Sequence, residues 1–143
     1  MTAVNKDAIY SDVFKVMYYN VSGILAGSLM GIFSFFPDTD FPGYPICTIE
    51  SADVGFGRVT MGRSYASEQG IDVGISLYSK SMQNLDELSG KLISGLMASD
   101  KSANGTYASG LCHFNIESSP TSTDVMGTDR VHSKAFGVSY VSR

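Results

Sequence analysis

Residues 70–78 alternate between apolar and polar or small side chains, and this pattern constrains the fold more than any other feature of the sequence. The apolar positions are Ile71, Val73, Ile75 and Leu77. A period of two is typical of a strand with one face against a core and the other face in water. We therefore predict a mostly antiparallel sheet, with Asp72 and Ser76 on its wet face.

Two helices are predicted, one on each side of this strand in the chain. The first covers residues 5–29 and carries apolar side chains on two neighbouring stripes, so it is either buried or shared between a core and a partner. The second covers residues 81–99, has one apolar stripe, and can be capped by Ser79 or Ser81. Its apolar positions are Met82, Leu85, Leu88, Leu92, Ile93, Leu96 and Met97. The two-faced first helix is the first indication of oligomerisation.

The remaining predicted strands complete an α+β fold. They cover residues 31–36, 44–50, 58–65, 111–118 and 135–141, and residues 58–65 form a hairpin with the alternating strand. The polar stretch 119–130 is predicted to be a loop. We expect a mostly antiparallel sheet with two helices packed on one face. A chain of 143 residues fits one domain, residues 1–143.

Charge and cysteine usage narrow the function classes. Ten basic residues against fourteen acidic ones give a net charge of −4, which disfavours a nucleic-acid-binding protein. Cys47 and Cys112 are expected to be small buried hydrophobes in a reducing compartment, since the first twelve residues lack the apolar core of a secretory signal.

Residues 16–37 contain no charge, and three glycines in them recur at four-residue spacing. This stretch is long enough to cross a bilayer, so a small membrane-associated protein is an alternative. Four polar residues and a cluster of aromatic residues instead favour the end of a helix followed by a short strand.

No constellation of residues predicts catalysis, a metal or a cofactor. Residues 57–64 approach a phosphate-binding loop, but Arg63 replaces its lysine and no helix can follow. Cys112 and His113 are neighbours on a strand and so point to opposite faces. A nucleophile pair of Cys112 with His132 is geometrically possible, but nothing in the sequence forces the two together. A metal site would use His113, His132 and an acidic residue. We expect a protein that is not an enzyme.

The order of elements resembles the tail terminator (tail completion) proteins of long-tailed bacteriophages. The resemblance covers nearly the whole chain. It rests on the helix at 8–29, the run Gly-Ile-Phe-Ser-Phe-Phe-Pro at 31–37 leading into 41–50, the strand 71–79 with its Leu-rich helix, and the pairing of 111–118 with 136–141 after Arg130.

This resemblance implies a structural virion protein at the neck end of the tail, assembled in the host cytoplasm. Six copies would form a ring that caps the tail tube, ends its polymerisation and docks the head-side connector, or stopper, while DNA passes through the lumen without specific binding and no membrane takes part. Another head–tail joining (neck) subunit is an alternative. The expected subunit or tube contacts are Tyr10, Phe14, Tyr18, Arg63, Tyr65 and Glu68. Asp72 and Ser76 are expected to face the lumen, where an acidic surface would keep the duplex from sticking.

Overall fold

The computed structural model describes most of the chain. The described residues are 9–34, 36–37, 42–50, 53–58, 67–99, 111–126 and 129–142. Within them the elements follow the order α1 (Ile9–Ile24), β1 (Gly31–Phe33), β2 (Ile46–Ile49), β3 (Asp53–Arg58), β4 (Ser67–Ser79), α2 (Met82–Ser99), β5 (Leu111–Ser118), β6 (Ser122–Met126) and β7 (Asp129–Ser142). The chain is a single α+β domain, as predicted.

The strands form one mixed sheet with the order β1-β2-β4-β7-β5, in which β3 also pairs with β4 and β6 also pairs with β7. All pairings are antiparallel except the parallel pairing of β1 with β2. The centre is the long pair of β4 and β7, in register from Gln69↔Ser142 to Ser79↔His132. The alternation predicted for β4 is confirmed, because its four apolar side chains are buried while Asp72 is exposed and Ser76 half-buried.

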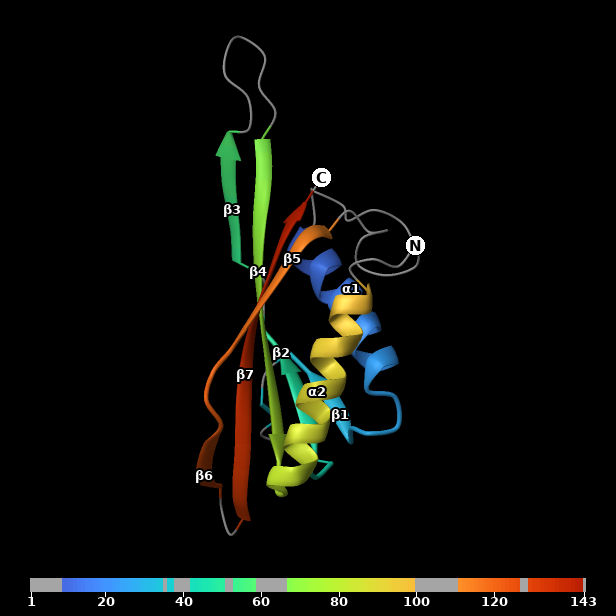
Figure 1. Ribbon diagram of the computed structural model, residues 1–143, viewed down its shortest axis with the longest axis vertical. Helices are drawn as coiled ribbons and strands as arrows, with labels where there is room; N and C mark the ends of the chain where they lie inside the picture. Colours follow the sequence, from blue (N-terminus) through green and yellow to red (C-terminus); the bar gives the residue numbers. More distant parts are fainter. Residues whose placement is uncertain are drawn as a thin grey trace.

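Single extra residues interrupt the strands that flank this central pair. Ile49 pairs with Ile75, and Asp53 pairs with Asp72. Three positions therefore separate Ile49 from Asp53, whereas two separate their partners on β4. A second interruption separates β5 from β6 along β7, and a third lies between Cys112 and Asn115. Each extra residue bends a strand and increases its twist. The β3–β4 hairpin extends past the helices at one end of the sheet, and the β6–β7 hairpin lies at the other end (Figure 1).

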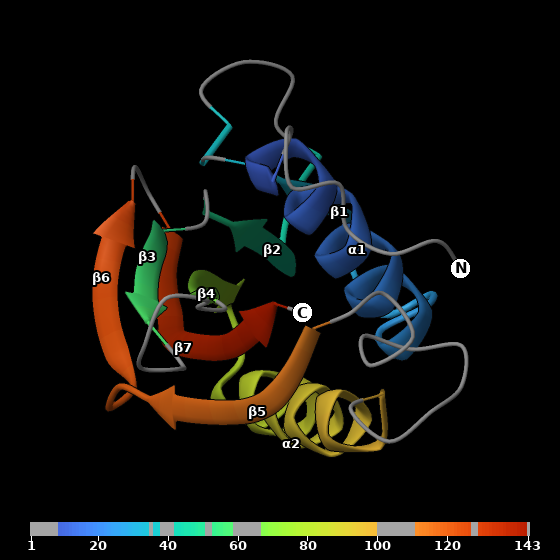
Figure 2. The same cartoon turned by 90° about the horizontal axis from the view of Figure 1, so that it is seen from above.

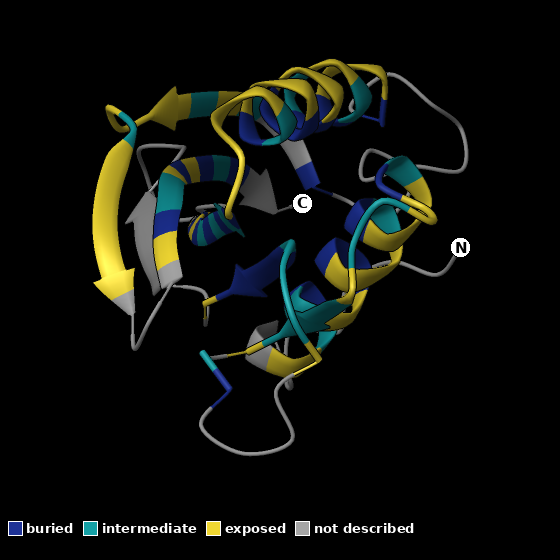
Figure 3. Ribbon diagram, turned by 90° about the horizontal axis from the view of Figure 1, so that it is seen from below, coloured by how far each residue is buried: buried dark blue, intermediate teal, exposed yellow. Residues whose placement is uncertain are grey.

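Both helices cover the same face of the sheet, as predicted (Figures 1 and 2). The buried side of each helix meets the buried strand residues in one core (Figure 3). The fully or nearly fully buried helix residues are Val13, Met17, Val21 and Leu25 of the first helix and its following turn, and Leu85, Leu88, Leu92 and Leu96 of the second. The predicted apolar stripe on α2 is wrong at both of its ends, since Met82 and Met97 are exposed and do not belong to the core.

The two helices run antiparallel and touch closely at one crossing point. Ser99 donates a hydrogen bond to the side-chain oxygen of Asn20, whose amide donates in turn to the Val16 carbonyl, with N···O 2.8 Å. One turn away, Gly95 lies against Ile24 so closely that a Cβ at Gly95 would come within 2.5 Å of the Ile24 Cγ2 atom. A glycine therefore sets the distance between the helices.

The helix boundaries follow local capping. The Ser81 hydroxyl accepts a hydrogen bond from the Asn84 backbone N–H at 3.3 Å, which confirms Ser81 as the cap of α2. Helix α1 ends at Ile24, five residues earlier than predicted, because the chain then forms a turn through Gly27 with a φ of 74°. A left-handed residue after the last turn is a common way to end a helix, and glycine adopts it without strain.

Three strand predictions need correction. The first strand is three residues long and not six. The hairpin partner of β4 is β3, whereas the predicted arm at 58–65 lies almost wholly outside the described residues. The predicted loop at 119–130 is wrong: most of it is β6 and the start of β7, paired from Ser122↔Ser133 to Met126↔Asp129. The sequence signal was Gly127-Thr128, because a Gly-X dipeptide is typical of two-residue hairpin connections.

Candidate interaction surfaces

The last two turns of α1 and the segment that follows them carry exposed aromatic and apolar side chains and no charged side chain, whereas Lys15, one turn before Tyr18 and Tyr19 on the same side of the helix, is exposed and charged. We call this uncharged region the α1 surface; its exposed residues are Tyr18, Tyr19, Ser22, Gly23, Ala26, Gly27 and Met30. Exposed fractions reach 41% for Tyr18, 71% for Tyr19 and 56% for Met30. Large apolar groups in water are unfavourable, so these side chains are candidates for contact with another molecule.

A hollow of about 290 Å³ lies beside this surface, between the end of α1 and strand β1. Tyr18 and Ser22 form part of its wall on the helix, and Gly31 and Ile32 form part of it on the strand. None of the described residues that line the hollow is charged, and β1 is the end strand of the sheet order.

The residues predicted to contact a neighbour differ in their exposure and in whether their side chains are described. Phe14 is half-buried and packs against the core, with its ring centroid 6.2 Å from that of Tyr18. Tyr10 lies in α1 and Glu68 in β4, but their side chains, like Arg63 and Tyr65 as a whole, lie outside the described residues. The structure thus brings Phe14 and Tyr18 together, and only Tyr18 of this pair is exposed.

Tyr19 and Met30 are also exposed, and both were missed from the sequence. Tyr19 follows Ser11 and Lys15 at four-residue spacing, so it lies on the polar stripe of the helix. An aromatic residue on that stripe could have indicated that Tyr19 is exposed. Met30 follows the helix in an irregular segment, where no periodicity could have identified it.

The second surface is the face of the sheet away from the helices, which we call the back face. Its middle consists of small residues on the two central strands, and Gly74 is paired directly with Gly137. Asp72 accepts a hydrogen bond from the Ser139 hydroxyl at 2.7 Å. The Glu50 carboxylate lies over Gly74, since its Oε2 would be 3.2 Å from a Cβ there.

The back face is acidic. Pairing of Glu117 with Gly137 places that exposed carboxylate on the same face, because opposed residues in a ladder share a face. Among the described side chains at the level of β4 residues 72–76 there are three carboxylates and no lysine or arginine on this face. Glu50 and Glu117 were missed because the register, and not the sequence pattern, places them on the same face as Asp72.

Aromatic side chains cover the back face around Tyr78. The Phe36 ring meets Tyr78 edge-on at 5.2 Å and lies 6.5 Å from Tyr44, while Ile46 and Thr48 are buried. The open part of the back face is therefore limited to the acidic region and its small residues.

The catalytic and metal alternatives find little geometric support. Cys112 pairs with Val141, whereas His132 pairs with Ser79, and nine residues along β7 separate the two positions. At 3.4 Å per residue this is a separation of roughly 30 Å. The alternation predicted for Cys112 and His113 is interrupted by the extra residue beside them, and their side chains lie outside the described residues. Across the described part of the chain, no three histidine, cysteine or acidic side chains form a group that could hold a metal ion.

One observation argues against the phosphate-binding loop, and another bears on the membrane alternative. The element after residues 57–64 is strand β4, where a phosphate loop requires the N-terminus of a helix. Neither helix in the described ranges has both the length and the apolar character needed to cross a membrane.

Cys47 is buried in the core, as predicted, and burial raises the pKa of its thiol to about 12. A thiol that stays protonated at neutral pH is a poor nucleophile. Cys47 is therefore a packing residue.

Models of known protein families give no match to this chain, and the characterised proteins with which it was compared give none either.

Proposed function

We propose that this protein is a ring-forming subunit of a long-tailed phage that caps the tail tube, ends its polymerisation and docks the head-side connector. The observation that carries the proposal is the α1 surface. One protomer leaves two tyrosines, a methionine and an uncharged hollow in contact with water. A neighbouring copy or the tail tube protein would cover this surface and gain the free energy of burying it.

The back face has the properties expected of a lumen wall. Asp72 with Glu50 and Glu117 repels the phosphates of a passing duplex, and the small residues between them offer few groups that could grip a base or a sugar. Asp72 and half-buried Ser76 would face the DNA, and the helices would face away from it.

The sequence resemblance adds the order of elements to this argument. The described elements follow the predicted order of a first helix, short strands, a long hairpin, a Leu-rich helix and a terminal pairing, with a further hairpin added between the last strands. The ring of six copies, the tube partner and the connector partner come from that resemblance.

Tail length in particles that lack the protein tests the proposal. A terminator limits tube growth, so we expect overlong tails without it. Tails of normal length that fail to join heads would contradict termination and favour another neck subunit.

Charge reversal tests the lumen assignment separately. Asp72→Lys together with Glu117→Lys should increase retention of the purified assembly on double-stranded DNA at low salt, because two repulsive charges become attractive. Asp86→Lys together with Glu87→Lys, two exposed carboxylates on α2, is the matched control, because it makes the same change of charge on the side that would face away from the DNA and should raise retention less. Equal DNA retention by the back-face variant and the unmodified protein would argue against a DNA-facing back face.

A further inference from the structure

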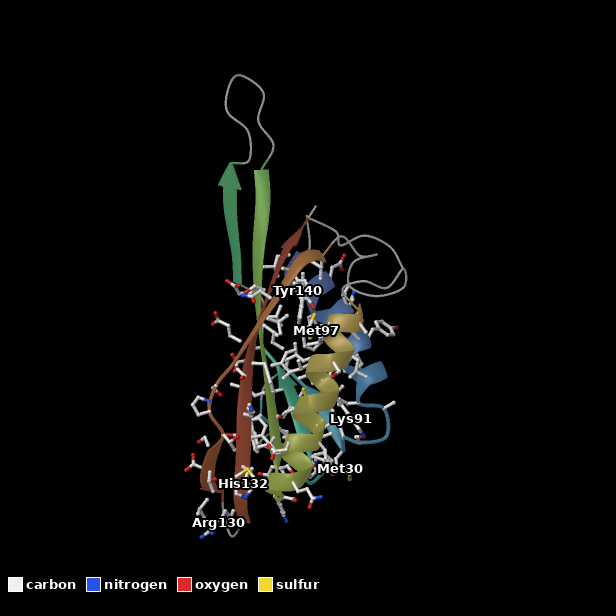
Figure 4. All side chains as sticks on the ribbon, viewed as in Figure 1. Met30, Lys91, Met97, Arg130, His132 and Tyr140 are labelled. Atoms are coloured by element: carbon white, nitrogen blue, oxygen red, sulfur yellow. The ribbon has the colours of Figure 1, made fainter. Side chains whose placement is uncertain are left out.

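We draw no further inference here: the strongest candidate, the hollow between the end of α1 and strand β1, with exposed Met30 next to its wall residue Gly31 (Figure 4), carries nothing, because no part of the chain that the structure describes shows what covers it.

Discussion

Replacement of Gly95 by alanine tests the closest contact in the fold, the crossing of the two helices. The added Cβ would stand 2.5 Å from Cγ2, 2.6 Å from Cγ1 and 2.9 Å from Cδ1 of Ile24. These atoms belong to a β-branched side chain with one strongly preferred rotamer in a helix, so they cannot move away freely. The helices must separate or Ile24 must leave its rotamer.

The expected magnitude follows from two opposing effects. Alanine is about 1 kcal/mol better than glycine in a helix interior. Overpacking a well-filled contact costs about 1–3 kcal/mol. Gly95→Ala should therefore change the free energy of unfolding by between zero and about 2 kcal/mol, in the destabilising direction.

Gly90 is the matched control. It lies on the same helix, is exposed, and has no atom within 4 Å of the position its Cβ would take. Gly90→Ala should stabilise the protein by about 1 kcal/mol, since only the propensity effect remains. Urea unfolding at one fixed protomer concentration measures both variants, and with a slope of about 2 kcal/mol/M their midpoints should differ by roughly 0.5–1.5 M.

A second background identifies the cause. Ile24→Ala removes all three clashing atoms, so in that background Gly95→Ala should stabilise the protein about as much as Gly90→Ala does. If Gly95→Ala stabilises the unmodified protein as strongly as Gly90→Ala, the close crossing does not exist and the reasoning fails.

Three further outcomes follow from the described contacts. Ser81→Ala should destabilise the protein by about 1 kcal/mol in urea unfolding, because α2 loses its cap; no loss would contradict the capping bond. Leu92→Ala should lower the free energy of unfolding by about 2–5 kcal/mol, because it leaves a cavity in the core. Met97→Ala, at an exposed position, should change it by less than about 0.5 kcal/mol. Equal effects of the two variants would contradict the core assignment. With Cys112 replaced by serine, Cys47 should resist alkylation at pH 8 in the folded protein and react after unfolding. Burial raises the pKa of its thiol from 9.0 to about 12 and so keeps the thiol protonated. Rapid labelling of the native state would show that Cys47 is accessible.

The core elements could be predicted because their periodicity is local. The alternation in β4 and the leucine spacing in α2 each specify an element and the face it buries. The order of elements then limits the fold to helices on one face of an antiparallel sheet.

The β6–β7 hairpin could not be predicted in the same way. Its first strand has four exposed residues out of the four side chains described, so no apolar face distinguishes it from a polar loop. Pairing with β7 decides its structure, and that pairing depends on residues that follow it in the chain. Gly127-Thr128 was the one local indication.

The candidate surfaces could be predicted only in part. Asp72 was expected on the wet face of its strand and Tyr18 in a contact with a neighbouring subunit; both side chains are exposed, whereas Phe14, expected in the same contact, is half-buried. Glu50 and Glu117 join Asp72 because strands distant in the sequence are placed side by side, and single-residue shifts decide which side chains share a face. Such shifts leave no period in the sequence.

The mass of the assembled protein tests the central claim, that copies cover the α1 surface of their neighbours in a closed ring. Native mass spectrometry should detect one dominant oligomer, of six copies if the resemblance holds, in the purified protein or after addition of tail tube protein. A monomer at every concentration, both alone and with the tube protein, would contradict the account.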